Sequence, residues 1–445
     1  MSPGCFRTFL CGVAFIVTAG VHGQTYDQAA VRMFHELGKQ PNPLDRYLYL
    51  QEIGPRLSRA NSILAGQMSA FALSELGLYT QAVLAFPLKM SPIEGLVLPD
   101  ASNWKGVNAL DAIANRASDR KIVMINEVHH NAQTRALTLQ LLPRLRALGF
   151  TYLAIEALGK DPGLAKRGYP LRSSGTEYLQ EPLYGEIVRE AVRLGFELVH
   201  YDYDKAGADV ETREVGQAKN LYDRVFAKDP QARLVVAGGY AHVDKAIGRL
   251  GQVQPMAMIL TKLVGSDPLS IDQAQFLDVD WSDDDYHQLV KRFPSDVPEV
   301  LVDRKTGHLW SAKPELYDIS VISPPMLSIK AFGNVSNVPP QPVRLEPDGH
   351  YVYPKASNVM FRPAWLELGG LRHAYPIDTR LCRDQLPCAV DAHYIGEPNN
   401  ASPADIYAFF SAGSVTRLYL RPGRYRLRAW TREGRTLSQS NINVH

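Results

Sequence analysis

Apolar and polar positions follow two different periods along the chain. In residues 24–100, apolar side chains recur at near-helical spacing, as in the set Ala29, Val31, Met33, Phe34 and Leu37. From about residue 120, short runs that are apolar at every position alternate with amphipathic segments. Strands that are apolar on both faces and separated by helices indicate a parallel sheet covered on both sides. The pattern therefore predicts an α/β fold, a parallel sheet with helices on both faces, preceded by a helical N-terminal subdomain.

The α/β region is expected to span residues 101–321 and to contain four well-marked strand and helix pairs. The apolar runs that predict its strands cover 121–125, 152–155, 197–201 and 233–237. The amphipathic segments that predict its helices cover 132–148, 183–194, 212–227 and a stretch from about 242.

The C-terminal part of the chain has a different pattern. Residues 322–347 are rich in proline and lack helical periodicity, which predicts a linker. Residues 348–445 resemble short strands, and 417–430 alternate across a Pro-Gly pair, which predicts a hairpin. Its inward-facing side chains would be Leu418, Leu420, Tyr425, Leu427 and Ala429. We expect 348–445 to form a small β-sandwich with its arginines facing outward.

Charge and hydropathy exclude two classes of protein. The 48 Lys and Arg residues nearly balance the 46 Asp and Glu residues, for a net charge of +2, so the basic excess typical of a nucleic-acid binder is missing. No apolar run approaches the roughly 20 residues needed to cross a bilayer, so no transmembrane span is predicted.

The N-terminus and the cysteines point to an oxidising compartment. Residues 1–23 combine a basic residue, a short apolar stretch and a small-residue cleavage site, which is typical of a signal peptide, with a buried N-terminal helix as the alternative. Its removal leaves two cysteines, Cys382 and Cys388. Two cysteines make a poor metal site, and we expect a disulfide between them. The mature protein is therefore expected to be periplasmic or secreted.

Polar residues follow each of the four predicted strands, and the carboxyl ends of parallel strands meet at the edge of the sheet where ligands bind. The residues concerned are Glu127, His129 and His130 after the first strand, Glu156 after the second, Asp202 and Asp204 after the third, and His242 after a Gly-Gly turn that follows the fourth. This recurrence predicts one site built from several strand ends.

Carboxylates and imidazoles in one pocket can act as general acid and base or bind a divalent metal such as Mn, Co or Zn. Glu127, His129 and His242 are the candidate metal ligands. Arg135, on the next helix, could stabilise an oxyanion. Simpler interpretations remain: a surface histidine pair, a salt bridge at Glu156, a helix cap at His242 and a surface position for Arg135. Arg213 and Glu214 open a helix, where capping explains them.

Several common catalytic motifs are missing. The chain contains no Gly-x-Ser-x-Gly elbow, no His-Glu-x-x-His sequence and no P-loop. Any chemistry would therefore have to come from the carboxylates and histidines, with or without a metal.

These motifs together resemble one superfamily, which includes erythromycin esterase, the ChaN haem-uptake lipoprotein and the Tiki proteases. The resemblance covers about residues 115–320. It rests on Glu127-Val-His129, the Leu-rich helix that follows, Tyr-Leu-Ala-Ile-Glu156 and Gly-Gly-Tyr-Ala-His242. It implies an α/β core with a pocket at the carboxyl edge of the sheet.

The resemblance assigns roles residue by residue. Glu127 with His129 or His130 would match the first catalytic motif, Glu156 the second carboxylate, His242 the final histidine, and Arg135 the esterase arginine. The spacing Glu-x-His matches the haem-uptake branch and Glu-x-x-His the esterases, so the motif histidine stays open. The family usually has glycine where this chain has Asn126.

Three functions are compatible with these residues. The first is a hydrolase of ester or amide bonds, in which a histidine acts as general base on water, helped by Glu127 or a divalent metal; its substrate would be a small molecule or a peptide. The second is a protein that binds haem or another metal complex without turnover, with Tyr201 and Tyr240 as further contacts. The third is an interaction protein with a degenerate site.

Overall fold

The structure is a computed structural model and describes residues 27–203, 205, 207–280, 284–326, 342–346, 351–352 and 362–445. The predicted signal peptide, 1–23, and most of the predicted linker, 322–347, lie outside these residues. No helix of the described chain has the length and apolar character needed to cross a membrane.

The N-terminal region is helical, as predicted. Its helices are α2 (Gln28–Leu37), α3 (Pro43–Ile53), α4 (Arg59–Glu75) and α5 (Tyr79–Ala85). Asp27, Asn42 and Ser58 cap the first three, because each side-chain oxygen accepts a backbone N–H of the first turn. Helix α4 is buried along most of its length, so it packs inside the molecule rather than on its surface.

The α/β region contains a mostly parallel sheet of eight strands in the order β1-β7-β8-β6-β2-β5-β3-β4. Six neighbouring strands, from β8 to β4, are parallel, and β7 runs antiparallel to both of its neighbours. The strands are β1 (Trp104–Asn108), β2 (Ile122–Glu127), β3 (Tyr152–Ile155), β4 (Glu197–His200), β5 (Leu234–Gly239), β6 (Leu269–Phe276), β7 (Glu299–Asp303) and β8 (Ile319–Ile322).

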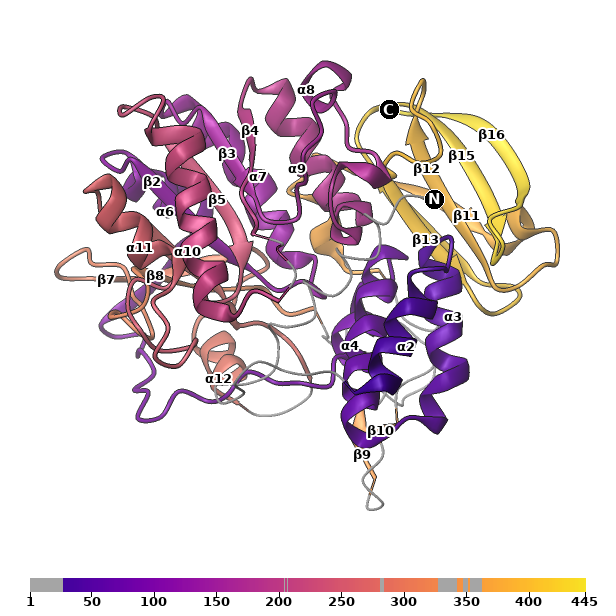
Figure 1. Ribbon diagram of the computed structural model, residues 1–445, viewed down its shortest axis with the longest axis horizontal. Helices are drawn as coiled ribbons and strands as arrows, with labels where there is room; N and C mark the ends of the chain where they lie inside the picture. Colours follow the sequence, from indigo (N-terminus) through magenta and orange to yellow (C-terminus); the bar gives the residue numbers. More distant parts are fainter. Residues whose placement is uncertain are drawn as a thin grey trace.

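Helices cover both faces of this sheet (Figure 1). Val123 and Ile125 of β2 pack in one core with α7 and α9, whereas Ile122 and Met124 pack in another with α10 and α11. The helices of this region are α6 (Ala109–Ala117), α7 (Gln133–Ala147), α8 (Leu164–Arg167), α9 (Pro182–Arg193), α10 (Val210–Leu221), α11 (Met256–Val264) and α12 (Asp285–Arg292). The continuous apolar runs therefore reflect burial on both sides, as predicted.

The helix predicted from about residue 242 is wrong. Residues 240–255 form turns, and α11 begins only at Met256, directly after Pro255. Gly251 in this segment has a φ of 67°, in the left-handed region that ends a helix. His242 therefore lies in a turn before the helix, and its carbonyl accepts the N–H of Ala257 in the first turn of α11 (3.0 Å).

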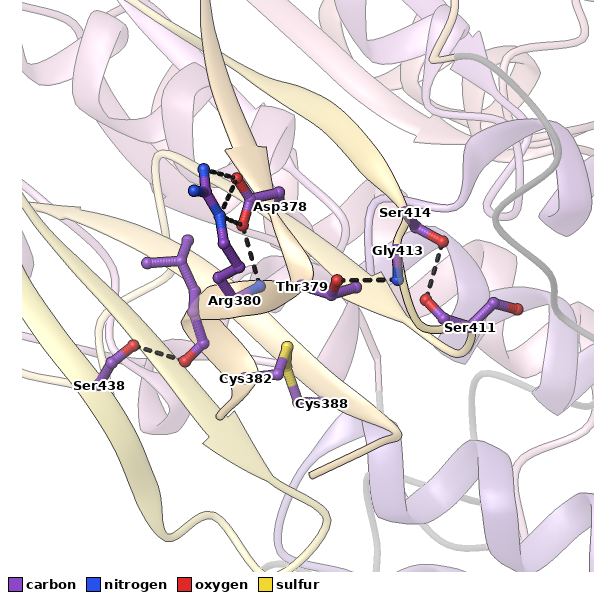
Figure 2. Close-up of a disulfide and its surroundings, with 10 residues drawn as sticks. Asp378, Thr379, Arg380, Cys382, Cys388, Ser411, Gly413, Ser414 and Ser438 are labelled. Carbon is purple, nitrogen blue, oxygen red and sulfur yellow. Dashed lines mark hydrogen bonds and ion pairs between the residues drawn. A yellow bond between two sulfur atoms is a disulfide. The ribbon is translucent and has the colours of Figure 1, made fainter. Parts of the chain in front are cut away.

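The C-terminal region consists of small antiparallel sheets. Their strands are β9 (Arg344–Leu345) with β10 (Tyr351–Val352), β11 (His373–Asp378) with β14 (Val415–Leu420), and β12 (Cys388–Tyr394), β13 (Asp405–Phe409), β15 (Gly423–Thr431) and β16 (Thr436–Val444) in the order β13-β12-β15-β16. The predicted disulfide between Cys382 and Cys388 is present, with the Cα atoms 6.0 Å apart (Figure 2).

The hairpin predicted over 417–430 is wrong, although both of its strands exist. β14 pairs with β11, whereas β15 pairs with β12 and β16, so Pro422 lies where the chain passes from one sheet to another. The alternation was nevertheless informative, because the five apolar side chains predicted to face inward are all buried.

The three regions share one hydrophobic core. Phe71 of α4, Leu137 of α7 and Tyr407 of β13 belong to the same buried cluster. In Figure 1 the N-terminal helices (indigo) lie beside the C-terminal strands (yellow) at one end of the molecule. The boundaries predicted from the sequence therefore separate three regions that pack against one another in the structure.

Candidate functional site

Three adjacent strands bring the predicted residues together. Glu127 is the last residue of β2, Glu156 follows β3 directly, and His242 lies three residues after the end of β5. Because β5 lies between β2 and β3, these residues meet at the carboxyl edge of the sheet. The site is buried: Glu127 is 5% exposed, Glu156 8% and His242 3%.

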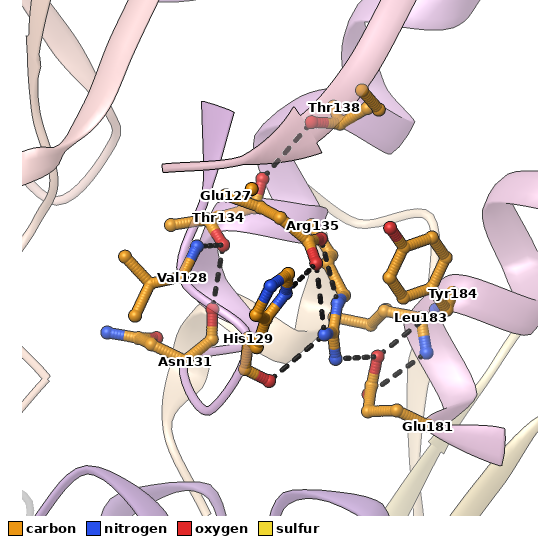
Figure 3. Close-up of polar contacts among 12 residues, drawn as sticks. Glu127, Val128, His129, Asn131, Thr134, Arg135, Thr138, Glu181, Leu183 and Tyr184 are labelled. Atoms are coloured by element: carbon orange, nitrogen blue, oxygen red, sulfur yellow. Dashed lines mark hydrogen bonds and ion pairs between the residues drawn. The ribbon is translucent and has the colours of Figure 1, made fainter. Parts of the chain in front are cut away.

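Glu127 and His129 form a hydrogen-bonded pair (Figure 3). His129 Nδ1 lies 2.7 Å from Glu127 Oε1. An ionised carboxylate can only accept, so Nδ1 carries the proton and neutral His129 has its lone pair on Nε2. Burial raises the pKa of Glu127, but the charge of Arg135 and the His129 hydrogen bond outweigh it and hold the pKa below its usual value. The pair thus has the arrangement of a histidine base oriented by a carboxylate.

Arg135 holds this pair in place. Its Nε donates to Glu127 Oε2 (3.1 Å) and its Nη2 to the carbonyl of His129 (3.0 Å). Its Nη1 donates to Glu181 Oε2 (3.2 Å), and its guanidinium lies 4.5 Å from the ring centroid of Tyr184. The side chain is 1% exposed, so Arg135 reaches these protein acceptors from the inside of the molecule.

His130 lies against a different part of the structure. Its ring stacks on that of Phe86, with the centroids 3.6 Å apart. Burial lowers its pKa well below the usual value, so His130 stays neutral. The sequence left two histidines open for the first motif, and the structure brings His129 to Glu127.

His242 lies between two carboxylates. Its Nδ1 is 2.5 Å from Glu214 Oε1, and its Nε2 is 3.5 Å from Glu156 Oε1. Burial alone would lower the pKa of His242, but the charges of Glu214 and Glu156 raise it to about 10. His242 is therefore an imidazolium at neutral pH, with its proton on Nε2 directed to the Glu156 side.

Glu156 binds the second arginine of the site, Arg213. Arg213 Nη2 donates to Glu156 Oε1 (2.8 Å) and to Asp202 Oδ1 (2.9 Å). Burial raises the pKa of Glu156, but His242 and Arg213 outweigh it and hold the pKa well below its usual value. Glu156 is thus ionised. Asp204 lies outside the described residues.

The Glu127–His129 pair and Glu156 both approach Gly239, the last residue of β5. Its backbone N–H donates to Glu156 Oε2. A Cβ at this position would lie 2.9 Å from His129 Nε2 and 3.0 Å from Glu156 Oε2, so a side chain here would collide with both. The glycine therefore allows Nε2 of His129 and the carboxylate of Glu156 to face the same stretch of backbone.

Aromatic side chains from two other segments form a wall of the site. Tyr178, just before α9, stacks on the His129 ring with centroids 4.5 Å apart. Phe71 of α4 meets the same ring edge-on at 6.3 Å. The N-terminal helices thus contribute directly to the surroundings of His129, which the sequence did not indicate.

The candidate metal ligands are engaged by other side chains in this arrangement. Within the described ranges, no three His, Cys, Asp or Glu side chains are grouped as a metal site. Both ring nitrogens of His242 face carboxylates, and Glu127 is bound to Arg135.

Sequence reasoning missed four residues that contact the site: Arg213, Glu214, Glu181 and Tyr178. Capping explained Arg213 and Glu214, but the structure shows that both point inward from the first turns of α10, where they are 6% and 0% exposed. In the sequence, Arg213 and Glu214 are two adjacent, oppositely charged residues in a polar segment, and nothing in that pattern indicates that they are buried. Only the arrangement of α10 against β5 reveals it.

No protein-family model and no curated protein matches the chain. Solved structures similar to part of it include the type III effector HopBA1, with 17% identity, 44% of this chain and 95% of that chain covered, and a TM-score of 0.27. RRSP, a MARTX toxin effector domain from Vibrio vulnificus CMCP6, has 16% identity, 50% and 47% coverage, and a TM-score of 0.29. A structure described as bacterial protein toxins has 13% identity, 60% and 72% coverage, and a TM-score of 0.29. Scores this low carry no argument about function.

Proposed function

We propose that the protein is a hydrolase of ester or amide bonds in which His129 is the general base. The observation that carries this proposal is the 2.7 Å contact between His129 Nδ1 and Glu127 Oε1, which leaves Nε2 directed toward Gly239 and Glu156. A histidine oriented by a carboxylate, with its second nitrogen facing a buried polar site, can accept a proton from water.

In the proposed reaction, His129 Nε2 takes a proton from a water molecule as the water oxygen attacks the substrate carbonyl carbon. Glu127 stabilises the imidazolium that forms on His129. The tetrahedral intermediate then collapses, the bond to the leaving group breaks, and His129 returns its proton to the leaving oxygen or nitrogen.

His242 would stabilise the oxyanion. Its Nε2 lies 3.5 Å from Glu156, longer than the 2.5 Å between its Nδ1 and Glu214. The looser contact makes the Nε2 proton the one that a developing negative charge can engage, and buried preorganised donors of this kind are effective. Arg135 acts through Glu127 and is a positioning residue.

Secretion or export to the periplasm remains part of this proposal. The disulfide supports it, because such bonds persist mainly in oxidising compartments. The substrate would be a small molecule or a peptide, reaching a site with an aromatic wall formed by Phe71 and Tyr178.

The test is hydrolysis of a panel of chromogenic esters and fluorogenic peptides by the full chain purified from the periplasm. His129→Gln should lower kcat/KM by at least roughly 100-fold, the usual effect of removing a general base. His130→Gln, one residue further on, should keep most of the activity. Equal losses in the two variants would refute the assignment. Absence of hydrolysis together with a haem absorption band that depends on His129 would favour the binding function instead.

A further inference from the structure

Asn126, the residue before Glu127 on β2, is fully buried and bonded on every side. Its amide nitrogen donates to Asp272 Oδ1 of β6 (2.5 Å) and to the carbonyl of Tyr240 (3.2 Å), which lies in the turn after β5. Its Oδ1 accepts the backbone N–H of Gln273 (2.8 Å). Two acceptors on one side and one donor on the other fix the orientation of the amide. Asn126 thus joins β2, β6 and the turn after β5.

The turn that Asn126 holds has an uncommon backbone. Tyr240 has a φ of 42°, in the left-handed region that bulky residues rarely adopt. Its N–H donates to the carbonyl of Glu127 (3.3 Å), and its carbonyl accepts from Asn126. Both backbone groups of Tyr240 are therefore bound by two consecutive residues of β2. Such conformations persist where the surroundings hold them, and they concentrate at functional sites.

Further contacts fix the same turn from the other side. The Arg249 guanidinium lies 5.4 Å from the Tyr240 ring centroid. Arg249 Nη1 donates to Asp272 Oδ1 (2.9 Å), the same oxygen that accepts from Asn126, and its Nε donates to Asp244 Oδ2 (2.9 Å). The carboxylate of Asp272 thus connects the amide of Asn126 with the arginine that covers Tyr240.

Both ends of the turn carry site groups. Gly239, before Tyr240, faces His129 Nε2 and Glu156 Oε2. His242, after it, donates its N–H to the carbonyl of Gly239 (3.2 Å). A change in the backbone at Tyr240 would therefore move the imidazolium of His242 relative to the Glu127–His129 pair.

We propose that Asn126 is a positioning residue that holds the left-handed turn at Tyr240 and thereby sets His242 and Gly239 against Glu127 and His129. The catalytic part of this inference rests on the proposed hydrolase function. Its structural part, the dependence of the turn on Asn126, can be measured without any substrate.

The structural test is amide hydrogen exchange of the full chain, comparing the natural protein with Asn126→Ala. Protection of the Tyr240 and His242 amides should fall at least about tenfold, while the amides of β3 stay unchanged. Asn126→Leu, which has a similar size but can neither donate to Tyr240 nor accept from Gln273, should show the same local loss. Asn42→Ala is the matched control, because Asn42 is another buried asparagine, whose amide donates to the carbonyl of Arg432 (2.7 Å) and whose Oδ1 accepts the N–H of Asp45 (2.9 Å) in the N-terminal helical region. Unchanged protection at Tyr240, or a loss spread equally over β3, would overturn the proposal.

The catalytic test uses a substrate hydrolysed by the natural protein. Asn126→Ala should lower kcat roughly tenfold or more with KM nearly unchanged, because the groups that act on the bound substrate are displaced. Asn42→Ala should change neither. A rise in KM alone would overturn the positioning role. The natural protein could hydrolyse no substrate while exchange at Tyr240 and His242 still increases in Asn126→Ala. That result would refute the hydrolase proposal and support the structural role of Asn126 in the turn.

Discussion

The site contains two histidines that have similar neighbours but differ in the carboxylates that contact their rings. Each lies beside a glutamate that is bound to a buried arginine: His129 beside Glu127 and Arg135, and His242 beside Glu156 and Arg213. His129 Nδ1 lies 2.7 Å from the Glu127 carboxylate, and its Nε2 is directed at Gly239 and Glu156. His242 faces a second carboxylate, Glu214, which makes it a lasting cation.

This comparison shows that a carboxylate in contact with each ring nitrogen, as at His242, favours the doubly protonated ring. A single carboxylate orients an imidazole and leaves a lone pair for substrate chemistry, whereas a second one keeps both nitrogens protonated. Two histidines from one sheet edge can thereby carry opposite roles at the same pH.

The largest effect is expected from changing the carboxylate of the first pair. Glu127→Gln keeps the shape but allows the amide to donate to Nδ1, which favours the wrong tautomer of His129, and kcat should fall by roughly 10⁴-fold. The measurement is kcat on the best substrate of the panel, with circular dichroism to confirm folding. Activity within tenfold of the natural protein would show that Glu127 does not orient the base.

A smaller effect is expected from changing the carboxylate that distinguishes the second histidine. Glu214→Gln should lower the pKa of His242 from about 10 by roughly 1 to 3 units, since one negative charge next to the ring is lost. The alkaline limb of the pH–rate profile should move to lower pH by the same amount, and a titration of the His242 ring followed by nuclear magnetic resonance should match it.

The matched control for that change is Glu211→Gln, which removes an exposed carboxylate from the first turn of the same helix. Its profile should coincide with that of the natural protein. If Glu211→Gln moves the alkaline limb as far as Glu214→Gln, then general surface charge rather than the contact with His242 sets the pKa.

The raised pKa of His242 also predicts how the stability depends on pH. The pKa of His242 is raised in the folded state to about 10, against about 6.5 in the unfolded chain. The folded state therefore holds the extra proton between these values, and the stabilisation is complete below about pH 6.5 and is lost as the pH rises toward 10. Urea unfolding at pH 6, 8 and 10 should show a steeper fall in the free energy of unfolding for the natural protein than for His242→Gln. Parallel curves would contradict the raised pKa.

Much of the α/β region could be predicted from the sequence, because burial on both faces leaves a continuous apolar run at each central strand. β3 has the predicted bounds. β2 and β5 each begin one residue later and end two residues later than predicted. The hairpin over 417–430 could not be excluded, because alternation reports which face is buried and not which strand is the neighbour.

The candidate site was predictable only where a residue ends a strand. Glu127, Glu156 and His242 come together as expected, since parallel strands end at one edge. The choice of His129 over His130 depends on the direction of each ring after a turn, and the role of Glu214 depends on how α10 packs. Neither is contained in a local pattern.

Phe71 of α4 lies against the His129 ring, and this contact limits what truncated versions of the protein can reveal about the site. A shortened chain that began at β1 would lose Phe71 and expose the apolar surface that now packs against the N-terminal helices. If such a fragment were inactive, the cause would be the loss of packing in the hydrophobic core and not the loss of a catalytic group. Mapping the activity by successive truncation is therefore uninformative here, and single substitutions in the intact chain are the appropriate tool.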